Sequence, residues 1–395
     1  DHHDIEQGIP DAFAVVNPKQ EAPEHPCAKL CGAGVAFKIA SALNNACNDL
    51  DIAALGTVAD IVPLQGENRV IVALGLRHMI KHRRLGIDRL ASAAGIALPD
   101  ITAEKIGFQL GPRLNAAGRL DDALGALHLL LAEEPDEATR LARALNTANE
   151  QRRAIEREIL EQCTEELDAF FHPGMRSIVI ARQGWHAGVI GIVASRLQHR
   201  YNRPTIVIAF EEDGTGRGSA RGGAGFNMVG ALAQCQSLLV KFGGHHAAAG
   251  LTIMQDDVET FRSQFEAEAL NQLGGGELQP ELSIDVLAGL SEIDTELLNN
   301  LNHLEPFGHK NPAPIFASMA VQTVPNSIRI LKDEHLKISL RQGNTELSAI
   351  GFGMAERFYT HNLNGMVDVA YTPKFNTWRG ETTIQLLLKD IRPAE

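Results

Sequence analysis

Long hydrophobic runs are missing from this chain, and their absence excludes one large class of proteins. No stretch approaches the roughly 18 consecutive apolar residues that a transmembrane helix needs. No charged leader followed by an apolar stretch is found either, so we expect no signal peptide. These absences predict a cytoplasmic protein with no membrane partner.

Cysteine is the second scarce feature. The chain has five cysteines, an odd number without a Cys-x-x-Cys pair, which indicates reduced thiols rather than a disulfide framework. His25, Cys27 and Cys31 lie close enough in the sequence to raise a zinc site. Because no second ligand pair follows them, we do not expect zinc there.

Positive charge is also in short supply. The 36 basic residues and 49 acidic residues give a net charge of −13, which argues against a nonspecific nucleic-acid coat, since such proteins are normally basic. One segment departs from this balance and contains Arg176, Arg182, Arg196, Arg200, Arg203, Arg217 and Arg221 against only Glu211, Glu212 and Asp213. An acidic body with a basic channel would suit an enzyme that holds one strand, although ordinary solvated arginines would give the same pattern.

The 395 residues, 44% of them hydrophobic, predict two to three domains with a sizeable core. Within residues 1–134 we expect strands to alternate with helices. Residues 12–16 form a β-prone run, whereas Val35, Ile39 and Leu43 mark one face of a helix. This alternation predicts part of an α/β domain.

Residues 50–62 are apolar nearly throughout and predict a buried helix. Asp60 is the charged residue that stands out in this run. A carboxylate buried among aliphatic side chains is costly unless it is paired or binds a cation. The pattern therefore favours a metal-ligand role for Asp60.

Residues 135–172 predict a long helix that connects two domains. Apolar residues recur there at three- and four-residue steps, and Pro135 suits a first helical turn. Arg152 and Gln162 interrupt the apolar seam. A connector within one chain is therefore favoured over a coiled-coil dimer, and we expect a monomer.

Residues 173–273 predict a second α/β domain. Its β-rich runs are residues 177–181 and 205–210, with a helix between them. A second helix should begin after its cap Asn227 and stop at Gly243 and Gly244.

Residues 277–395 predict a small closed barrel of the oligonucleotide-binding (OB) type. The runs with period-two alternation are 282–286, 317–321, 336–340, 346–350, 366–371 and 383–388, interrupted by one short helix at 294–304. The aromatic residues Phe352, Tyr371, Phe375 and Trp378 could stack on bases or fill the core.

Five ordered motifs point to a family. They are Asp1-His2-His3 with the later Asn17-Pro18; Gly56-Thr57-Val58-Ala59-Asp60; Arg113-Leu114-Asn115-Ala116-Ala117-Gly118-Arg119; Gly184-Trp185-His186 leading to Gly218-Ser219-Ala220-Arg221; and Gly243-Gly244-His245-His246. In this order, and with a β-rich C-terminal segment, the chain resembles the bacterial RecJ-type single-strand-specific exonucleases of the DHH phosphoesterase superfamily. The resemblance runs over essentially the whole chain.

The resemblance implies an α/β fold in four parts. These are the C-terminal part of a DHH catalytic domain (1–134), a connecting helix (135–172), a DHH-associated domain (173–273) and an OB-fold barrel (277–395). The family pattern also has an Asp-x-Asp motif and a further metal-binding Asp upstream of the Asp-His-His motif, which this sequence does not contain. We therefore expect a truncated form with half of a metal site and little activity of its own.

The resemblance places a two-metal site for Mn²⁺ or Mg²⁺ at the first motif. His2 and Asp60 would be ligands, and imidazole with carboxylate suits these ions better than zinc. Successive side chains diverge on an extended segment, so His3 is placed on the scissile phosphate or in proton transfer. Asp1 would orient the ligands from the outer shell.

The later motifs predict substrate binding. Asn115 and Arg119 would share a helix face, and an arginine fork suits phosphate. Ser219 and Arg221, two residues apart on a strand, would point the same way, and family analogy gives them the terminal 5′-phosphate. Further substrate contacts are expected from His186, Gly243, Gly244 and His245.

The sequence thus predicts a metal-dependent exonuclease that degrades single-stranded DNA from the 5′ end, in recombination and repair. By resemblance its partners would include a single-strand-binding protein and a helicase. Two alternatives stay open: a phosphodiesterase for short oligonucleotides or cyclic dinucleotides, whose relatives lack the barrel, and a catalytically silent DNA-binding scaffold.

Overall fold

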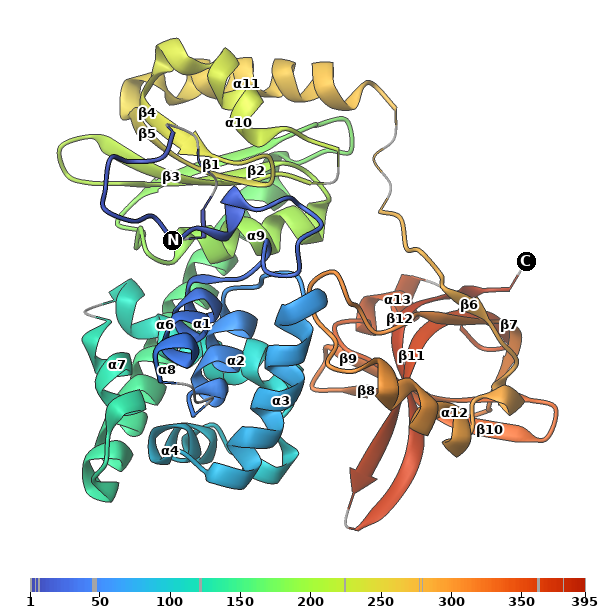
Figure 1. Cartoon of the computed structure of the whole chain (residues 1–395). Helices are drawn as coiled ribbons and strands as arrows, with labels where there is room; N and C mark the ends of the chain where they lie inside the picture. The colour runs from blue at the N-terminus through green and yellow to red at the C-terminus, as the bar shows by residue number, and fades with distance from the viewer. Residues whose placement is uncertain are drawn as a thin grey trace. The chain divides into compact units, whose positions relative to one another are not determined.

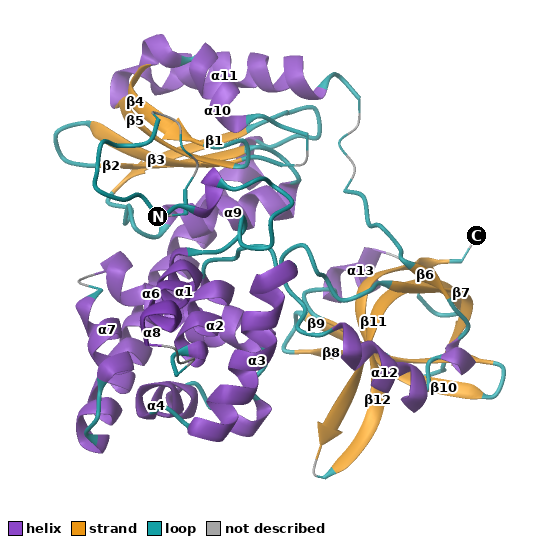
Figure 2. Cartoon of the chain, viewed as in Figure 1, coloured by secondary structure: helices purple, strands orange, loops and turns teal. Residues whose placement is uncertain are grey.

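The computed structural model describes residues 2–3, 5, 8–44, 48–120, 123–223, 225–276, 278, 280–360, 363–378 and 380–394. The chain divides into two compact units: unit 1 comprises Asp1–His82, Pro99–Phe108 and Leu282–Glu395, and unit 2 comprises Arg83–Leu98 and Gln109–Glu281. Figure 1 labels the helices and strands, and Figure 2 colours them by type. Over the described ranges, no helix combines the length and the apolar character needed to cross a membrane.

The N-terminal part of unit 1 is helical. Its elements are η1 (Pro18–Gln20), α1 (Gly32–Asn44), α2 (Leu50–Ala59), α3 (Gly66–His82), η2 (Leu98–Asp100, at the unit boundary), α5 (Ala103–Lys105) and the π-helical η3 (Ile106–Leu110). The helices predicted around Val35 and over residues 50–62 are confirmed as α1 and α2. Helix α2 packs between α1 and α3.

Two predictions for this region are wrong. Residues 12–16 form no strand, because neither described sheet places a strand beside them to pair their backbone groups. Asp60 is not buried: its side chain is 43% exposed, because α2 ends at Ala59 and Asp60 is the C-cap residue. The buried carboxylate of this helix is Asp51, which lies near His78 on α3.

The C-terminal part of unit 1 is a ring of strands. They are β6 (Val286–Leu287), β7 (Phe316–Thr323), β8 (Arg329–Leu331), β9 (His335–Gln342), β10 (Thr345–Gly351), β11 (Met366–Trp378) and β12 (Glu381–Pro393), with η6 (Leu290–Glu292), α12 (Thr295–Leu301), η7 (Asn302–Leu304) and α13 (Ala355–Thr360). The strand order is β6-β7-β11-β12-β10-β9-β8, and an additional β7–β9 pairing closes the ring seen in Figure 2. This ring corresponds to the predicted barrel.

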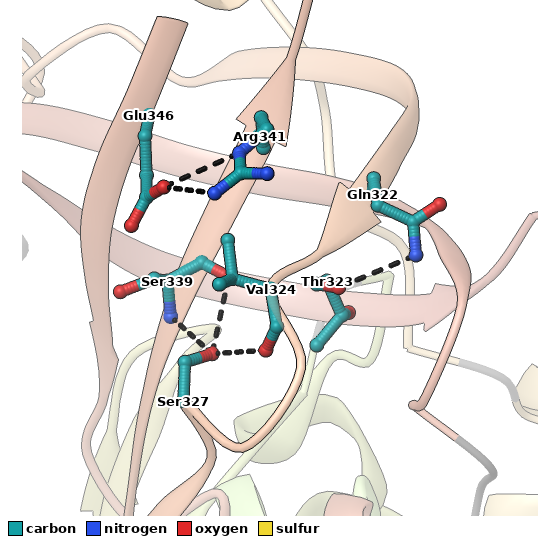
Figure 3. A network of polar contacts seen from close by, with 7 residues as sticks. All are labelled: Gln322, Thr323, Val324, Ser327, Ser339, Arg341 and Glu346. Atoms are coloured by element: carbon teal, nitrogen blue, oxygen red, sulfur yellow. Dashed lines mark hydrogen bonds and ion pairs between the residues drawn. The ribbon is translucent and has the colours of Figure 1, made fainter.

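Polar contacts reinforce the closure of the ring, as Figure 3 shows. The backbone pairs Gln322 with Arg341 and Thr323 with Leu340. Beside them the Ser327 hydroxyl donates to the Val324 carbonyl (2.7 Å) and accepts from a backbone N–H on β9 (3.0 Å). The turn after β7 is thereby fixed to β9.

The barrel prediction erred in detail. The run 282–286 contributes only the short β6, while β8 and α13 were not predicted. Tyr371 is fully buried, and its hydroxyl is hydrogen-bonded to Ser318 at 2.8 Å, so it belongs to the core and not to a base-stacking surface. Phe352 and Phe375 are exposed, and the side chain of Trp378 lies outside the described residues.

Unit 2 is built on a five-stranded sheet. Its helices are α4 (Leu85–Ala93), α6 (Gly111–Leu120), α7 (Leu124–Leu131), α8 (Pro135–Phe170), α9 (Ile190–Tyr201), α10 (Met228–Gln234), η4 (Gln236–Leu238), η5 (Gln255–Asp257) and α11 (Val258–Leu273). Its strands are β1 (Ile178–Gln183), β2 (Thr205–Phe210), β3 (Thr215–Arg221), β4 (Leu239–Gly244) and β5 (Ala248–Met254), in the order β1-β2-β3-β5-β4. Strands β1 and β2 are parallel, and the other pairs are antiparallel.

Two apolar cores cover the two faces of this sheet. Side chains of α8 and α9 pack with Ile178 and Val207 on one face. Side chains of α10 and α11 pack with Val179 and Ile206 on the other, and Figure 1 shows these helices on opposite sides of the strands. Because neighbouring residues of a strand point to opposite faces, this layering buries every residue of β2.

The long helix is confirmed as α8, and the helix after the cap Asn227 is confirmed as α10, but its predicted end at Gly243 and Gly244 is wrong. Helix α10 ends at Gln234, and residues 239–244 form strand β4 instead. The glycine pair Gly243 and Gly244 therefore ends a strand, since β4 pairs with β5 along its length.

Candidate metal and anion sites

His2 and Asp60 lie side by side in unit 1. The His2 Nε2 and Asp60 Oδ2 atoms are 3.4 Å apart, and both side chains keep contact with solvent, at 21% and 43% exposure. The two residues come from the opening segment and from the C-cap of α2, so the fold joins the first and second motifs. Asp1 lies outside the described residues.

A buried asparagine, Asn17, anchors this opening segment, a role that the sequence analysis did not assign to it. Asn17 donates from Nδ2 to the His3 carbonyl at 3.0 Å. Its Oδ1 accepts from Lys19 N at 2.9 Å and caps η1. The signal was present in Asn17-Pro18, because asparagine before a helical turn is a typical N-cap.

The expected divergence of the two histidines is wrong. The chain bends at His3, so the rings of His2 and His3 lie with centroids 4.4 Å apart and planes at 39°. The stated geometric reason for separating their roles therefore does not hold. Placing His3 on the phosphate depends on the family resemblance alone.

The donor set suits a hard divalent cation. Two ligands bound at about 2.1 Å to one octahedral ion lie roughly 3 Å apart, close to the observed separation of the His2 and Asp60 atoms. Within the described part of the chain, however, no group of three or more His, Cys, Asp or Glu side chains could hold an ion. The described residues therefore bring two donors together here, His2 and Asp60.

A second candidate site lies in unit 2, around Arg221 at the end of β3. Its guanidinium donates to the Ser195 hydroxyl (3.1 Å), the Ser219 hydroxyl (3.0 Å) and the Ala220 carbonyl (2.8 Å). Ser219 and Arg221 thus share a face, as their spacing predicted. Ser195, on α9, was not foreseen.

Close approach of α9 to β3 makes this arrangement possible. A Cβ on Gly191 would lie 2.9 Å from Ser219 Oγ and 3.0 Å from Arg221 Nη2. Gly191 therefore leaves room for the guanidinium beneath the first turn of α9. The Ser195 hydroxyl donates to the Gly191 carbonyl (3.1 Å) while it accepts from Arg221.

Arg119 and His186 border the same site. Arg119 donates from Nη1 to the Gly188 carbonyl at 3.0 Å, and Gly188 N donates to His186 Nδ1 at 3.1 Å. Because Nδ1 accepts, a neutral His186 carries its proton on Nε2 and can donate from there. Asn115 and Arg119 are both exposed on α6, in agreement with the predicted shared face.

The electrostatics of this site favour an anion. Burial lowers the pKa of Arg221, and the nearby positive charge of Arg119 lowers it further. No acidic side chain pairs with Arg221 among the described residues. The neighbouring guanidinium groups of Arg119 and Arg221 repel each other, and a bound phosphate would relieve that repulsion.

A buried carboxylate takes up the charge of two other arginines, and one of these, Arg152, lies near enough to Arg119 for the Arg119 charge to lower its pKa. Glu156 on α8 is paired with Arg196 and with Arg152. Burial lowers the pKa of Arg152, whereas the Glu156 charge raises it. The interruption of the apolar seam at Arg152 thus reflects a polar pair on α8.

The predicted glycine motif lies on the neighbouring strands. In the sheet register Ser219 pairs with Gly250, and Gly250 pairs with Gly243. His245 is exposed in the turn between β4 and β5, where its N–H donates to the Ala248 carbonyl at 2.8 Å. The structure therefore brings the motif near the end of β3, on a hairpin turn and not behind a helix as expected.

The arginine-rich segment is not one basic channel. Arg203 is buried and donates to the carbonyls of Met175 and Pro173. Arg217 and Arg182 are paired with carboxylates, and Trp185 is buried with its Nε1 donating to Gln162. Most of these arginines have local structural roles, because they form ion pairs or donate to backbone carbonyls.

Comparisons with known proteins match two segments of the chain to domain models and the whole chain to relatives. Residues 174–271 match the DHHA1 domain and residues 284–390 match the RecJ OB domain. The whole chain is 37% identical to the single-stranded-DNA-specific exonuclease RecJ of Bacillus subtilis, of which it spans 50%, and 34% identical to that of Haemophilus influenzae, of which it spans 73%. It also superimposes on the crystal structure of RecJ in complex with Mn²⁺ from Thermus thermophilus, with a TM-score of 0.86 and 30% identity over the whole of this chain and 58% of that one.

The two relatives align with the whole chain, and the two domain models match segments of it. The solved structure also covers the whole chain, at 30% identity. The chain spans about half the length of the first of these relatives and nearly three quarters of the second. It belongs to the RecJ family of single-stranded-DNA-specific exonucleases.

Proposed function

We propose that this chain is part of a metal-dependent exonuclease that digests single-stranded DNA from the 5′ end, in DNA recombination and repair. The observation that carries the proposal is the Arg221 site, a half-buried guanidinium held by neutral oxygen atoms beside a second arginine. Such a site recognises a phosphate group. Its assignment to the terminal 5′-phosphate gives the enzyme its direction along the strand.

His2 and Asp60 would hold a Mn²⁺ or Mg²⁺ ion. A pair of such ions neutralises the phosphoryl oxygens and activates the attacking water. The relatives of known structure were crystallised with Mn²⁺ or Mg²⁺, which supports the same choice here. His3 would donate to the scissile phosphate or transfer a proton, and Asp1 would orient the ligands.

The remaining predicted residues would guide the strand. Ser219 and Arg221 would bind the terminal phosphate, with Arg119 and Asn115 on an adjoining phosphate. The DNA backbone would accept hydrogen bonds from His186 Nε2–H, from His245 and from the peptide groups of Gly243 and Gly244. We also propose the four-part division at 1–134, 135–172, 173–273 and 277–395, which the two domain matches support.

The partners follow from the family. We propose a monomeric cytoplasmic enzyme that works with a single-strand-binding protein and a helicase, which would supply and protect its substrate. A small-molecule phosphodiesterase is disfavoured by the strand ring and its match to the RecJ OB domain. A silent scaffold is disfavoured by the adjacent His2 and Asp60 side chains.

Replacement of Arg221 tests this function. In the full-length protein, Arg221→Ala should weaken binding of 5′-phosphorylated strands by about 1.5–3 kcal/mol, or roughly 10- to 150-fold, and should affect 5′-hydroxyl strands much less. Arg217→Ala is the matched control, because Arg217 lies on the same strand but is paired with Glu211. Equal losses on the two substrates would show that Arg221 serves the fold or the strand backbone.

A further inference from the structure

One loop of the OB segment contacts the turn that carries Asp60. The loop, residues 304–311, belongs to unit 1 together with α2 and α3. We propose that His309 in this loop is a positioning residue for the metal pair: it holds the connection after Asp60 so that the carboxylate stays beside His2. The inference rests on the proposed metal role of Asp60 and adds a function to the OB segment besides strand binding.

His309 binds both ends of the connection 61–64. Its ring Nδ1 lies 2.8 Å from the Ile61 carbonyl. Its backbone carbonyl accepts from Leu64 N at 2.8 Å. Because a carbonyl only accepts, the Nδ1 atom must carry the proton in this contact.

The connection needs such support because Ile61 is strained. Its φ angle is 57°, in the left-handed region, which a β-branched residue rarely adopts. A conformation of this kind is unfavourable and persists only where surrounding contacts impose it. The Ile61 side chain is 69% exposed, so packing does not hold it. The hydrogen bond from His309 lies directly on the strained residue.

The loop that presents His309 is itself well braced. Gly308 and Asn311 exchange two backbone hydrogen bonds, of 2.9 and 3.1 Å. The Asn311 side chain donates to the carbonyls of Leu304 (3.1 Å) and Pro306 (2.9 Å). The loop can therefore act as a fixed support and not as a flexible cover.

Further contacts fasten the loop to the start of α3. Arg69 donates from Nη2 to the carbonyls of His303 (3.1 Å) and Glu305 (3.3 Å), and Gln65 donates to the Lys310 carbonyl (3.0 Å). A Cβ on Gly308 would lie 2.6 Å from the Leu64 side chain, so glycine allows the loop to approach Leu64 without displacing it. The His309 contact is one part of an interface that fixes the register between loop and turn.

The consequence concerns the neighbouring carboxylate. Asp60 N donates to the carbonyls of Gly56 and Val58, so the backbone before Asp60 is fixed by α2. The backbone after it is fixed through Ile61 and His309. If the His309 bond is lost, Ile61 can leave the left-handed region, and the Asp60 side chain turns away from His2.

The test compares two polar replacements in the full-length protein, with Mn²⁺ affinity as the readout. Asparagine places its amide N–H near the position of Nδ1, whereas glutamine places it one carbon further out. We expect His309→Gln to weaken Mn²⁺ binding, measured by calorimetry, about 10-fold or more, as for other residues that orient metal ligands. His309→Asn should bind within about threefold of the wild type, and His303→Gln, at an exposed side chain in the same segment, should leave the affinity unchanged.

Two results would overturn the inference. One is an unchanged Mn²⁺ affinity in His309→Gln with a lower melting temperature in chelator, which would make the loop a structural fastener alone. The other is an equal loss in His309→Asn and His309→Gln, which would exclude the Nδ1 donor. Asp60→Ala separates the two proposals: if it leaves Mn²⁺ binding intact, the metal role of Asp60 fails, whereas loss in Asp60→Ala without loss in His309→Gln removes only the role of His309.

Discussion

The metal pair in unit 1 and the arginine site in unit 2 are built in opposite ways. His2 and Asp60 come from a bent opening segment and a strained turn, and both are partly exposed. Arg221 lies on a paired strand, and hydroxyl and carbonyl oxygens fix its guanidinium. The comparison teaches that the proposed phosphate contacts are fixed by groups within unit 2. At the metal pair, by contrast, the described residues bring two donors together, and in our proposal their placement depends on contacts from elsewhere in unit 1.

The largest expected effect separates these two capacities. Residues 1–395 alone should show little or no Mn²⁺-dependent digestion of single-stranded DNA, because the described residues offer no group of three metal ligands. The same chain should still prefer 5′-phosphorylated over 5′-hydroxyl strands in a binding assay. Robust digestion by this chain would contradict the division, and so would equal affinity for the two strands.

The sequence predicted the elements whose side chains have a clear period. The spacing of Ser219 and Arg221 placed both on one face of a strand, and their hydrogen bond confirms it. Asn115 and Arg119 likewise share a face of α6. Period and spacing act within one element, so such relations can be read from the chain itself.

Relations between elements were missed for a physical reason. Ser195 contacts Arg221 only because α9 packs on β3, and Asn17 contacts His3 only because the opening segment folds back. The burial of Asp60 was mispredicted because α2 ends at Ala59 and not at the predicted residue 62, which places Asp60 at the exposed C-cap. No local pattern encodes these contacts, which tertiary packing creates.

Replacement of Glu156 should have an effect of intermediate size, and it separates the stability of unit 2 from its affinity for phosphate. Glu156→Gln removes the charge that pairs with Arg152 and Arg196, and breaking such a buried pair commonly costs about 3–5 kcal/mol of folding free energy. Less of the positive charge near Arg221 is then neutralised, so the affinity of the variant for inorganic phosphate should stay the same or rise. Scanning calorimetry and phosphate titration measure the two effects.

The control is Glu158→Gln, at an exposed position two residues further along the same helix. It should change neither the melting temperature nor the phosphate affinity by much. If Glu156→Gln instead weakened phosphate binding while stability held, the carboxylate would be shaping the site and not merely balancing charge.

Ser195 gives the smallest effect and tests how rigidly the arginine site is held. The Ser195 hydroxyl links Arg221 Nε to the Gly191 carbonyl, so Ser195→Ala should free one edge of the guanidinium. The loss should be about 1 kcal/mol, or roughly fivefold in affinity for 5′-phosphorylated strands, as for a single hydrogen bond. Ser263→Ala is the matched control, because Ser263 makes the same hydroxyl contact one helical turn back, to the Glu259 carbonyl on α11, and has no hydrogen bond to an arginine among the described residues. Since Ser195 would act only through Arg221, its replacement should add nothing once Arg221 is alanine. An additive loss in the double variant would mean that Ser195 contacts the DNA strand itself. Arg221 would then be held less rigidly than the comparison with the metal pair assumes.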